Sequence, residues 1–244
     1  MGFQSGVTAK RSLGQNFLVN SNLIEKIVII VLDSNPKHIT EIGAGKGAFT
    51  KVFYETTVPL TLIEKDYNLF QLLQNNYTNA QIYNLDFLDY KTSNFETTYF
   101  GSLPFNVSKD IINKILKSKT FNNPAFFIIQ KEVAQKYSNR EHNELGFIRE
   151  IYADFEILFD IKPGSFYPRP KVTSSFVKFL PKRDFKFPVD TKDLETLIHR
   201  SFKMPRKTIQ NNLSNYKYKI PNALKNKRAT ELQLSDYVSI LKNS

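Results

Sequence analysis

The chain carries the stretch EIGAGKG at residues 41–47, where a short apolar run ends and a helical pattern begins. Glycine adopts backbone conformations that other residues avoid, so Gly43, Gly45 and Gly47 would let this turn pass close to a ligand. The G-x-G-x-G spacing suits S-adenosylmethionine, which has no pyrophosphate, better than a dinucleotide bound by G-x-G-x-x-G. Taken alone, the motif is equally compatible with an ordinary tight turn between a strand and a helix.

Apolar runs and helical periodicity alternate on both sides of this turn. Strands are predicted at residues 38–42, 60–63, 80–85, 97–100, 125–130, 154–161 and 171–180. Helices are predicted at residues 21–32, 49–54, 67–73, 109–116 and 131–137. Such alternation indicates the α/β fold class, with right-handed βαβ units and a parallel sheet covered on both faces.

The strand pattern stops after residue 180. Short helices are predicted beyond it at residues 193–202, 207–213 and 235–241. We therefore expect two domains: a sheet domain at residues 1–180 and a small all-helical domain at residues 181–244.

Basic residues concentrate in the second of these domains. Residues 181–244 hold 14 Lys and Arg against 6 Asp and Glu, whereas residues 1–180 hold 20 against 17. This asymmetry predicts a polyanionic partner that docks largely on the C-terminal part. The alternative is a solubilising surface on a lysine-rich protein.

Composition excludes several other classes of protein. The chain has no cysteine, which rules out disulfides and thiolate metal sites, and its three scattered histidines give no basis for a zinc site. No apolar run reaches about 18 residues, so we expect no membrane span, and no secretory signal is evident. The cytoplasm is the default compartment, with a processed organellar form left open.

Single acidic residues end two of the predicted strands. Glu64 lies 21 residues after Gly43, where a carboxylate can accept hydrogen bonds from both ribose hydroxyls of a cofactor. Asp86 ends the next strand and could accept the exocyclic amino group of the cofactor's adenine. Asp89 is a competitor, but it lies past the strand end and we expect it on the surface. Glu64 could instead be a solvated charge within a charged cluster.

The stretch SLPF at residues 102–105 ends a fourth strand at the same edge of the sheet. An adenine amino nitrogen is a poor nucleophile because its lone pair is delocalised into the ring. The Ser102 hydroxyl and a backbone carbonyl near Leu103 or Pro104 could accept its two hydrogens, and Phe105 could stack on a flipped base. Together with the glycine turn, this predicts methyl transfer to adenine by direct displacement, accelerated mostly by alignment. Alone, the stretch would be a proline turn with a buried phenylalanine.

The chain resembles the ribosomal RNA adenine N6,N6-dimethyltransferases, and within them the small-subunit dimethyladenosine transferases. The matching segments run nearly from end to end: GQNFL at 14–18, EIGAGKG at 41–47, IEKD at 63–66, Asp86, LPFNVS at 103–108, QKEVA at 130–134, FYPRPKVTSS at 166–175, RKTIQNNL at 206–213 and RA at 228–229. The resemblance implies a Rossmann-like, class I S-adenosylmethionine-dependent methyltransferase sheet followed by a small helical RNA-binding domain.

The resemblance also implies roles for individual residues. Contacts to S-adenosylmethionine are expected at Gln15, Asn16, Leu18, Gly43, Gly45, Glu64, Lys65, Asp86, Phe87 and Ser102. Catalytic contacts to the target base are expected at Ser102, Leu103, Pro104 and Phe105. From the basic residues themselves, and not from the resemblance, we expect phosphate contacts to RNA at Lys203, Arg206 and Lys207, assisted by Arg169 and Lys171, although any single one could be a solvated charge. The segment at 15–18 could fold over the cofactor or simply lead into the first helix.

The implied substrate is a pair of adjacent adenosines near the 3′ end of small-subunit rRNA, in free rRNA or in a pre-ribosomal small subunit. We expect a monomer that uses neither a metal nor a membrane. One residue departs from the family, because Ser102 stands where the family normally has Asn. Serine has one acceptor oxygen and a shorter reach, but it occupies the equivalent place in some DNA amino-methyltransferases.

Ser102 keeps a second class of function open. The chain could be a degenerate methyltransferase with reduced activity that serves as an RNA-binding assembly factor or a transcription factor. A third class is a large-subunit rRNA adenine methyltransferase that gives macrolide resistance, which the short length favours and the RKTIQNNL segment disfavours. A nicotinamide dehydrogenase explains neither the proline turn nor the basic C-terminal part.

Overall fold

The computed structural model describes residues 15–91, 96–138, 141–182 and 187–244. The chain forms two compact units. The first unit comprises residues 1–134 and 155–181, and the second comprises residues 135–154 and 182–244. The chain passes into the second unit at residue 182, next to the domain boundary predicted from the sequence. Residues 135–154, which we expected in the sheet domain, belong instead to the helical unit.

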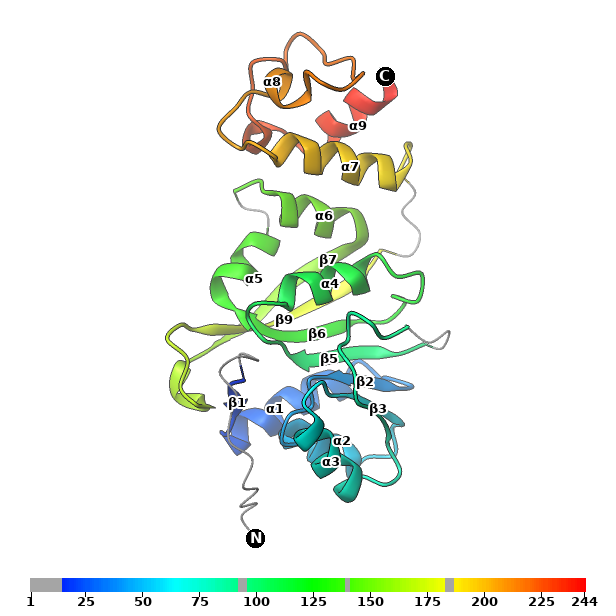
Figure 1. The fold of residues 1–244 in the computed structure, drawn as a ribbon, viewed down its shortest axis with the longest axis vertical. Coiled ribbons are helices and arrows are strands. Elements are labelled where there is room, and N and C mark those ends of the chain that lie inside the picture. Colours follow the sequence, from blue (N-terminus) through cyan, green and yellow to red (C-terminus); the bar gives the residue numbers. More distant parts are fainter. Residues whose placement is uncertain (1–14, 92–95, 139–140, 183–186) are drawn as a thin grey trace. The chain divides into compact units, whose positions relative to one another are not determined.

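A seven-stranded sheet forms the centre of the first unit (Figure 1). Its strand order is β4 (Gln81–Tyr83), β3 (Leu60–Ile63), β2 (Ile39–Ile42), β5 (Thr98–Ser102), β6 (Ala125–Gln130), β9 (Ser174–Pro181) and β7 (Ala153–Ile161). The five strands from β4 to β6 in this order run parallel to one another. Strand β9, on the other side of β6, runs antiparallel to it. The sheet is therefore mixed and not wholly parallel as predicted, because β9 follows β7 without a crossover helix between them.

The helices of this unit are α1 (Ser21–Leu32), α2 (Ala48–Tyr54), α3 (Tyr67–Asn76) and α4 (Ser108–Leu116), and the chain passes from this unit into the second within α5 (Lys131–Tyr137). Two of them, α1 and α3, begin at a side-chain cap, whereas the N-caps of α2 and α4 make no side-chain hydrogen bond. The Asn20 side chain accepts the Leu23 N–H at 3.1 Å and caps α1, and Asp66 caps α3 in the same way. Helix α3 continues three residues past its predicted end, and β4 is shorter than the strand predicted at 80–85.

The central strands are buried on both faces, which explains why they appear in the sequence as continuous apolar runs. Phe100 of β5 packs edge-on against Phe49 and Phe53 of α2, with ring centroids 4.8 and 5.1 Å apart. Its neighbour Tyr99 points to the opposite face and meets the Phe87 ring at 6.0 Å. Helices thus cover both faces and leave the strand ends open at the edge where the acidic and proline motifs lie.

The second unit has a hydrophobic core of its own. Its helices are α6 (Glu144–Tyr152), α7 (Thr191–Phe202), α8 (Ile209–Leu213) and α9 (Leu234–Lys242), with a 3₁₀ turn η3 at Ala229–Glu231. Phe147 of α6 is buried against Tyr237 of α9, with ring centroids 5.2 Å apart. Helix α6 presents Phe147, Ile148 and Ile151 on one face, and this apolar stripe needs the buried residues of α7 as its partner. Residues 135–154 belong to this unit for that reason.

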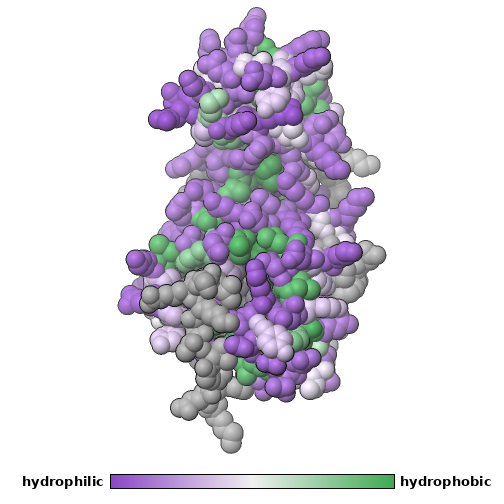
Figure 2. Space-filling view, viewed as in Figure 1, coloured by the Kyte–Doolittle hydropathy of each residue, from purple (hydrophilic) through white to green (hydrophobic). Residues whose placement is uncertain are grey.

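Hydrophilic residues predominate on the face drawn in Figure 2, and hydrophobic residues are scattered among them. Within the part of the chain that the structure describes, no helix is both long and apolar enough to cross a membrane.

Gly101 of β5 provides a test of how tightly the strand ends are packed. A Cβ atom at this position would lie 2.6 Å from the Ile42 carbonyl oxygen and 2.9 Å from Leu103 Cδ2. We expect Gly101→Ala to lower the free energy of unfolding by about 1–3 kcal/mol, because backbone must move to admit the methyl group. The control Gly164→Ala adds a methyl group in open space and should change it by less than about 0.5 kcal/mol. Equal unfolding midpoints of the two variants in urea would contradict this packing.

Candidate active site

A pocket opens at the carboxyl ends of the parallel strands in the first unit. It brings together all ten residues predicted to contact the cofactor and all four predicted to contact the base. These lining residues are Gln15, Asn16, Leu18, Gly43, Gly45, Glu64, Lys65, Asp86, Phe87, Ser102, Leu103, Pro104 and Phe105. They come from segments far apart in the sequence, and ligands of open α/β sheets bind at this edge.

The glycine turn takes the backbone conformation that its sequence predicts. Gly43, Gly45 and Gly47 have φ angles of 70°, 59° and 78°, a region that side-chain-bearing residues rarely adopt. A Cβ atom at Gly45 would lie 3.0 Å from Cε1 of Phe17, so the glycine also makes room for that ring. The Gly43 N–H donates to the Ile63 carbonyl at 2.8 Å and fixes the turn to the end of β3.

Glu64 is buried at the end of β3, with only 6% of its surface exposed. Its Oε2 accepts the Gly45 N–H at 2.8 Å, and its Oε1 accepts the Asp66 N–H at 2.8 Å. Burial raises the pKa of Glu64 above its usual value, and the hydrogen bonds from Asp66 and Gly45 oppose that rise. Glu64 is therefore not a solvated surface charge. A carboxylate offers about four lone-pair sites, so Glu64 can accept a ligand hydroxyl in addition to these backbone N–H groups.

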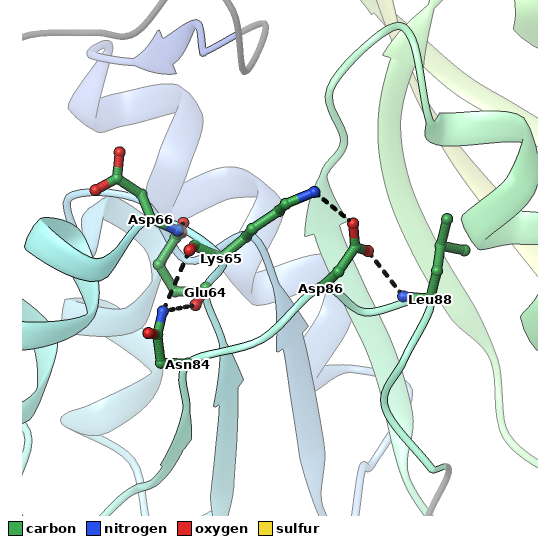
Figure 3. A network of polar contacts seen from close by, with 6 residues as sticks. All are labelled: Glu64, Lys65, Asp66, Asn84, Asp86 and Leu88. Carbon is green, nitrogen blue, oxygen red and sulfur yellow. Dashed lines mark hydrogen bonds and ion pairs between the residues drawn. The ribbon is translucent and has the colours of Figure 1, made fainter.

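Figure 3 shows Asp86 between two donors. The Lys65 ammonium donates to its Oδ2 at 2.8 Å, and the Leu88 N–H donates to its Oδ1 at 2.9 Å. Burial acts to raise the pKa of Asp86, but the Lys65 and Leu88 hydrogen bonds outweigh it and the pKa lies below its usual value. Asn84 follows β4, and its amide donates to the backbone carbonyls of Glu64 and Lys65, which follow β3, at 2.9 and 3.2 Å. These hydrogen bonds hold the ends of β3 and β4 together. Asp89 is exposed and lies outside the pocket lining.

The proline turn places a half-buried Ser102 and Phe105 in the pocket wall. The Leu103 N–H donates to the Ile128 carbonyl at 3.0 Å, which fixes the turn to β6. The Pro104 carbonyl accepts the N–H groups of Val107 and Ser108 at 3.3 and 3.0 Å as α4 begins. Of the two carbonyls considered from the sequence, Leu103 is therefore the better candidate for a second acceptor.

A short strand pair brings the N-terminal segment to the pocket. Strand β1 (Phe17–Leu18) pairs antiparallel with β8 (Phe166–Tyr167), and the Val19 N–H donates to the Ser165 carbonyl at 2.8 Å. Phe17 and Phe166 both line the pocket, and neither was predicted from the sequence to do so. Two-residue strands have too few positions to show a period, so no sequence signal for this pairing exists.

Glu41 is a further pocket residue that was not predicted from the sequence. It is 2% exposed, and its Oε2 accepts the Thr50 hydroxyl at 2.7 Å. Burial raises the pKa of Glu41 to about 8; the Thr50 hydrogen bond lowers it and the nearby Glu64 raises it further. An acidic residue inside an otherwise apolar strand, directly before the glycine turn, was the available signal.

The five predicted RNA contacts are all exposed, in two places. Arg169 and Lys171 lie after β8 in the first unit. Lys203, Arg206 and Lys207 lie in the α7–α8 loop of the second unit.

The buried side chain of Asn212 holds that loop. Its Oδ1 accepts the Met204 N–H at 3.0 Å, and its Nδ2 donates to the Met204 and Lys207 carbonyls at 3.0 and 3.3 Å. The loop therefore presents its basic side chains from a fixed backbone. Among all the residues that the structure describes, no group of three or more His, Asp or Glu side chains could hold a metal ion.

The sequence is similar to known proteins over nearly its whole length. Residues 6–243 match a family described as Ribosomal RNA adenine dimethylase. A protein of Malacoplasma penetrans (strain HF-2) named Ribosomal RNA small subunit methyltransferase A is 37% identical over 216 residues, which cover 85% of this chain and 79% of the relative. A protein of the same name from Francisella tularensis subsp. tularensis (strain WY96-3418) is 33% identical over 251 residues, covering 95% and 96%.

Two solved structures share the fold. A dimethyladenosine transferase from Plasmodium falciparum superposes with a TM-score of 0.77 at 19% identity, covering 93% of this chain and 96% of the other. The 23S rRNA methyltransferase ErmE superposes with a TM-score of 0.72 at 19% identity, covering 93% and 98%. At this level of identity the likeness concerns the fold alone.

The raised pKa of Glu41 leads to a test of the pocket's electrostatics. Because the pKa of Glu41 is raised to about 8, folded protein keeps this proton up to about pH 8, whereas the unfolded chain loses it near the ordinary glutamate pKa of 4.5. Between these values the folded state binds more protons, so this group lowers the free energy of unfolding as the pH rises. Glu41→Gln keeps an acceptor for Thr50 and has no proton to lose. Relative to native protein, we expect its stability to rise by up to about 1.4 kcal/mol per pH unit between about pH 5 and 8.

Urea unfolding at several pH values in that interval measures the difference. Glu55→Gln, at the exposed end of α2, is the matched control and should show a much smaller trend. A stability difference between Glu41→Gln and native protein that does not change with pH would contradict the buried, protonated Glu41.

Proposed function

The chain belongs to the ribosomal RNA adenine dimethylase family, and on this basis we propose that it transfers methyl groups from S-adenosylmethionine to the N6 atoms of two adjacent adenosines near the 3′ end of small-subunit rRNA. The observation that carries the proposal is the single pocket at the strand ends. This pocket is lined both by the residues suited to the cofactor and by the SLPF turn suited to an adenine amino group.

The residues present fit the cofactor. The glycine turn offers backbone without side chains, Glu64 has lone pairs to accept the two ribose hydroxyls, and Asp86 is an ionised acceptor for the adenine amino group. When bound, S-adenosylmethionine supplies an activated methyl group on a positively charged sulfur. Glu64 and the paired Asp86 bind and orient it, and Phe17 packs over the glycine turn at the same site.

The proline turn holds the nucleophile. The Ser102 hydroxyl and the Leu103 carbonyl accept the two amino hydrogens, which favours a tetrahedral nitrogen with its lone pair aimed at the methyl group. Phe105 stacks on the extruded base, a contact worth on the order of 1–3 kcal/mol. Because the reaction is a direct displacement, the residues contribute mainly by fixing distance and angle. None of them needs to form a covalent intermediate.

The choice of the small subunit rests on the relatives in sequence. Both named bacterial relatives are small-subunit methyltransferases, at 37% and 33% identity over most of the chain. The exposed basic residues of the two units supply the phosphate contacts in this proposal, and the partner is small-subunit rRNA or a pre-ribosomal small subunit. Two finer points remain predictions: the protein acts as a monomer, and it acts in the cytoplasm.

One residue supports a second candidate function. Ser102 has a shorter side chain, with its oxygen nearer the backbone, where the family normally has an asparagine, and this favours a scaffold that binds the cofactor and rRNA but transfers methyl groups slowly or not at all. The intact Glu64, Asp86 and Phe105 in the pocket support the enzyme over the scaffold.

Mass spectrometry of rRNA separates these functions. Unmethylated small and large ribosomal subunits are incubated with S-adenosylmethionine and either native protein or Ser102→Asn. We expect dimethyladenosine near the 3′ end of small-subunit rRNA from native protein, with Ser102→Asn changing the rate by less than about tenfold, because serine still supplies one acceptor. Product only from Ser102→Asn would identify a scaffold, and product in the large subunit would identify the macrolide-resistance class.

A further inference from the structure

Lys114 of α4 makes an unusual set of hydrogen bonds to the loop after β4. Its ammonium donates to the backbone carbonyls of Phe87 at 2.9 Å, Leu88 at 2.6 Å and Tyr90 at 2.7 Å. The same nitrogen lies 5.3 Å from the centroid of the Phe87 ring. A lysine ammonium has three N–H donors, and here each of them has a carbonyl acceptor.

These three carbonyls belong to one tight turn. The Asp89 N–H donates to the Asp86 carbonyl at 2.9 Å, and the Tyr90 N–H donates to the Phe87 carbonyl at 3.1 Å. All three carbonyls converge on the Lys114 ammonium, whose positive charge strengthens each of these hydrogen bonds. No neutral side chain donates three hydrogen bonds from one atom, so a lysine suits this position better than any uncharged residue.

The turn that Lys114 holds forms part of the pocket wall. Asp86 and Phe87 both line the pocket. The Phe87 carbonyl accepts one of the Lys114 hydrogen bonds, and Asp86 comes directly before Phe87 in the chain. Lys114 itself does not line the pocket, but Ile111, one helical turn before it, does. Helix α4 therefore connects the SLPF turn at its beginning with the Asp86 turn at Lys114.

We propose that Lys114 is a positioning residue that sets the affinity for the adenosine half of S-adenosylmethionine by holding the turn that carries Asp86 and Phe87. This inference rests on the proposed function. Lys114 touches neither the cofactor nor the base in this account. Replacing Lys114 should therefore weaken the binding of every ligand that places an adenosine in the cofactor site. It should not slow the methyl transfer step once the cofactor is bound.

The test compares ligand affinity with turnover. Lys114→Met keeps the aliphatic stem and removes all three donors, and Lys109→Met removes an exposed lysine from the same helix as the matched control. Calorimetry measures the dissociation constants of S-adenosylmethionine and of methylthioadenosine, which keeps the adenosine and lacks the amino acid. We expect Lys114→Met to weaken both by roughly tenfold or more, since several charge-assisted hydrogen bonds are lost. We expect kcat at saturating cofactor to stay within about threefold of native protein, and Lys109→Met to match native protein in every measurement.

Each outcome has a distinct meaning. Unchanged affinity of Lys114→Met for both ligands, with native protein binding them, would overturn the role of Lys114 and leave the proposed function standing. A loss of kcat with unchanged affinity would also overturn it. Failure of native protein to bind S-adenosylmethionine would instead overturn the proposed function. If Lys114→Met does not fold, Lys114→Gln gives the same comparison, because its amide still lacks the charge and the third donor.

Discussion

The buried carboxylate of Glu64 is the contact on which the pocket depends. It accepts one N–H from the glycine turn after β2 and another from Asp66, which in turn caps α3. Loss of the carboxylate would leave two backbone N–H groups without acceptors in a buried place, at a cost of about 1–3 kcal/mol each. The same oxygens remain available to a ligand, so one side chain both builds the turn and faces the site that the turn forms.

Charge is divided within the molecule in a way that suits a nucleic-acid enzyme. The whole chain carries a net charge of +11, and the five predicted RNA contacts are exposed. The pocket, in contrast, is lined by Glu41, Glu64 and Asp86 together with Lys46 and Lys65. Lys65 is paired with Asp86, and Lys46 lies over the Phe17 ring. A phosphate backbone is thus attracted to the exposed basic residues. In the pocket Glu41 keeps its proton and Asp86 is paired with Lys65, so the carboxylates of Glu64 and Asp86 act there as hydrogen-bond acceptors for the cofactor.

The sequence predicted the parts of this arrangement that have a local signature. The strands with their terminal acids, the glycine turn and the SLPF turn each follow from a period or a motif within a few residues, and they met in one pocket. Other parts have no local signature. Helix α6 belongs to the second unit because its apolar stripe packs against α7. The β1–β8 pair brings together segments about 150 residues apart in the sequence. Lys114 donates to three carbonyls of a loop that lies before its own helix in the chain. Such contacts follow from the fold and not from the neighbouring sequence.

The most direct test of this account is the affinity of the protein for S-adenosylmethionine before and after Glu64→Gln, measured by calorimetry with Glu55→Gln as an exposed control. The glutamine amide would turn an N–H donor toward one of the two backbone N–H groups that Glu64 now accepts. We predict sub-millimolar binding by native protein and by the control, and at least roughly tenfold weaker binding by Glu64→Gln. Native-like affinity in a folded Glu64→Gln variant would contradict the claim that this carboxylate organises the cofactor pocket.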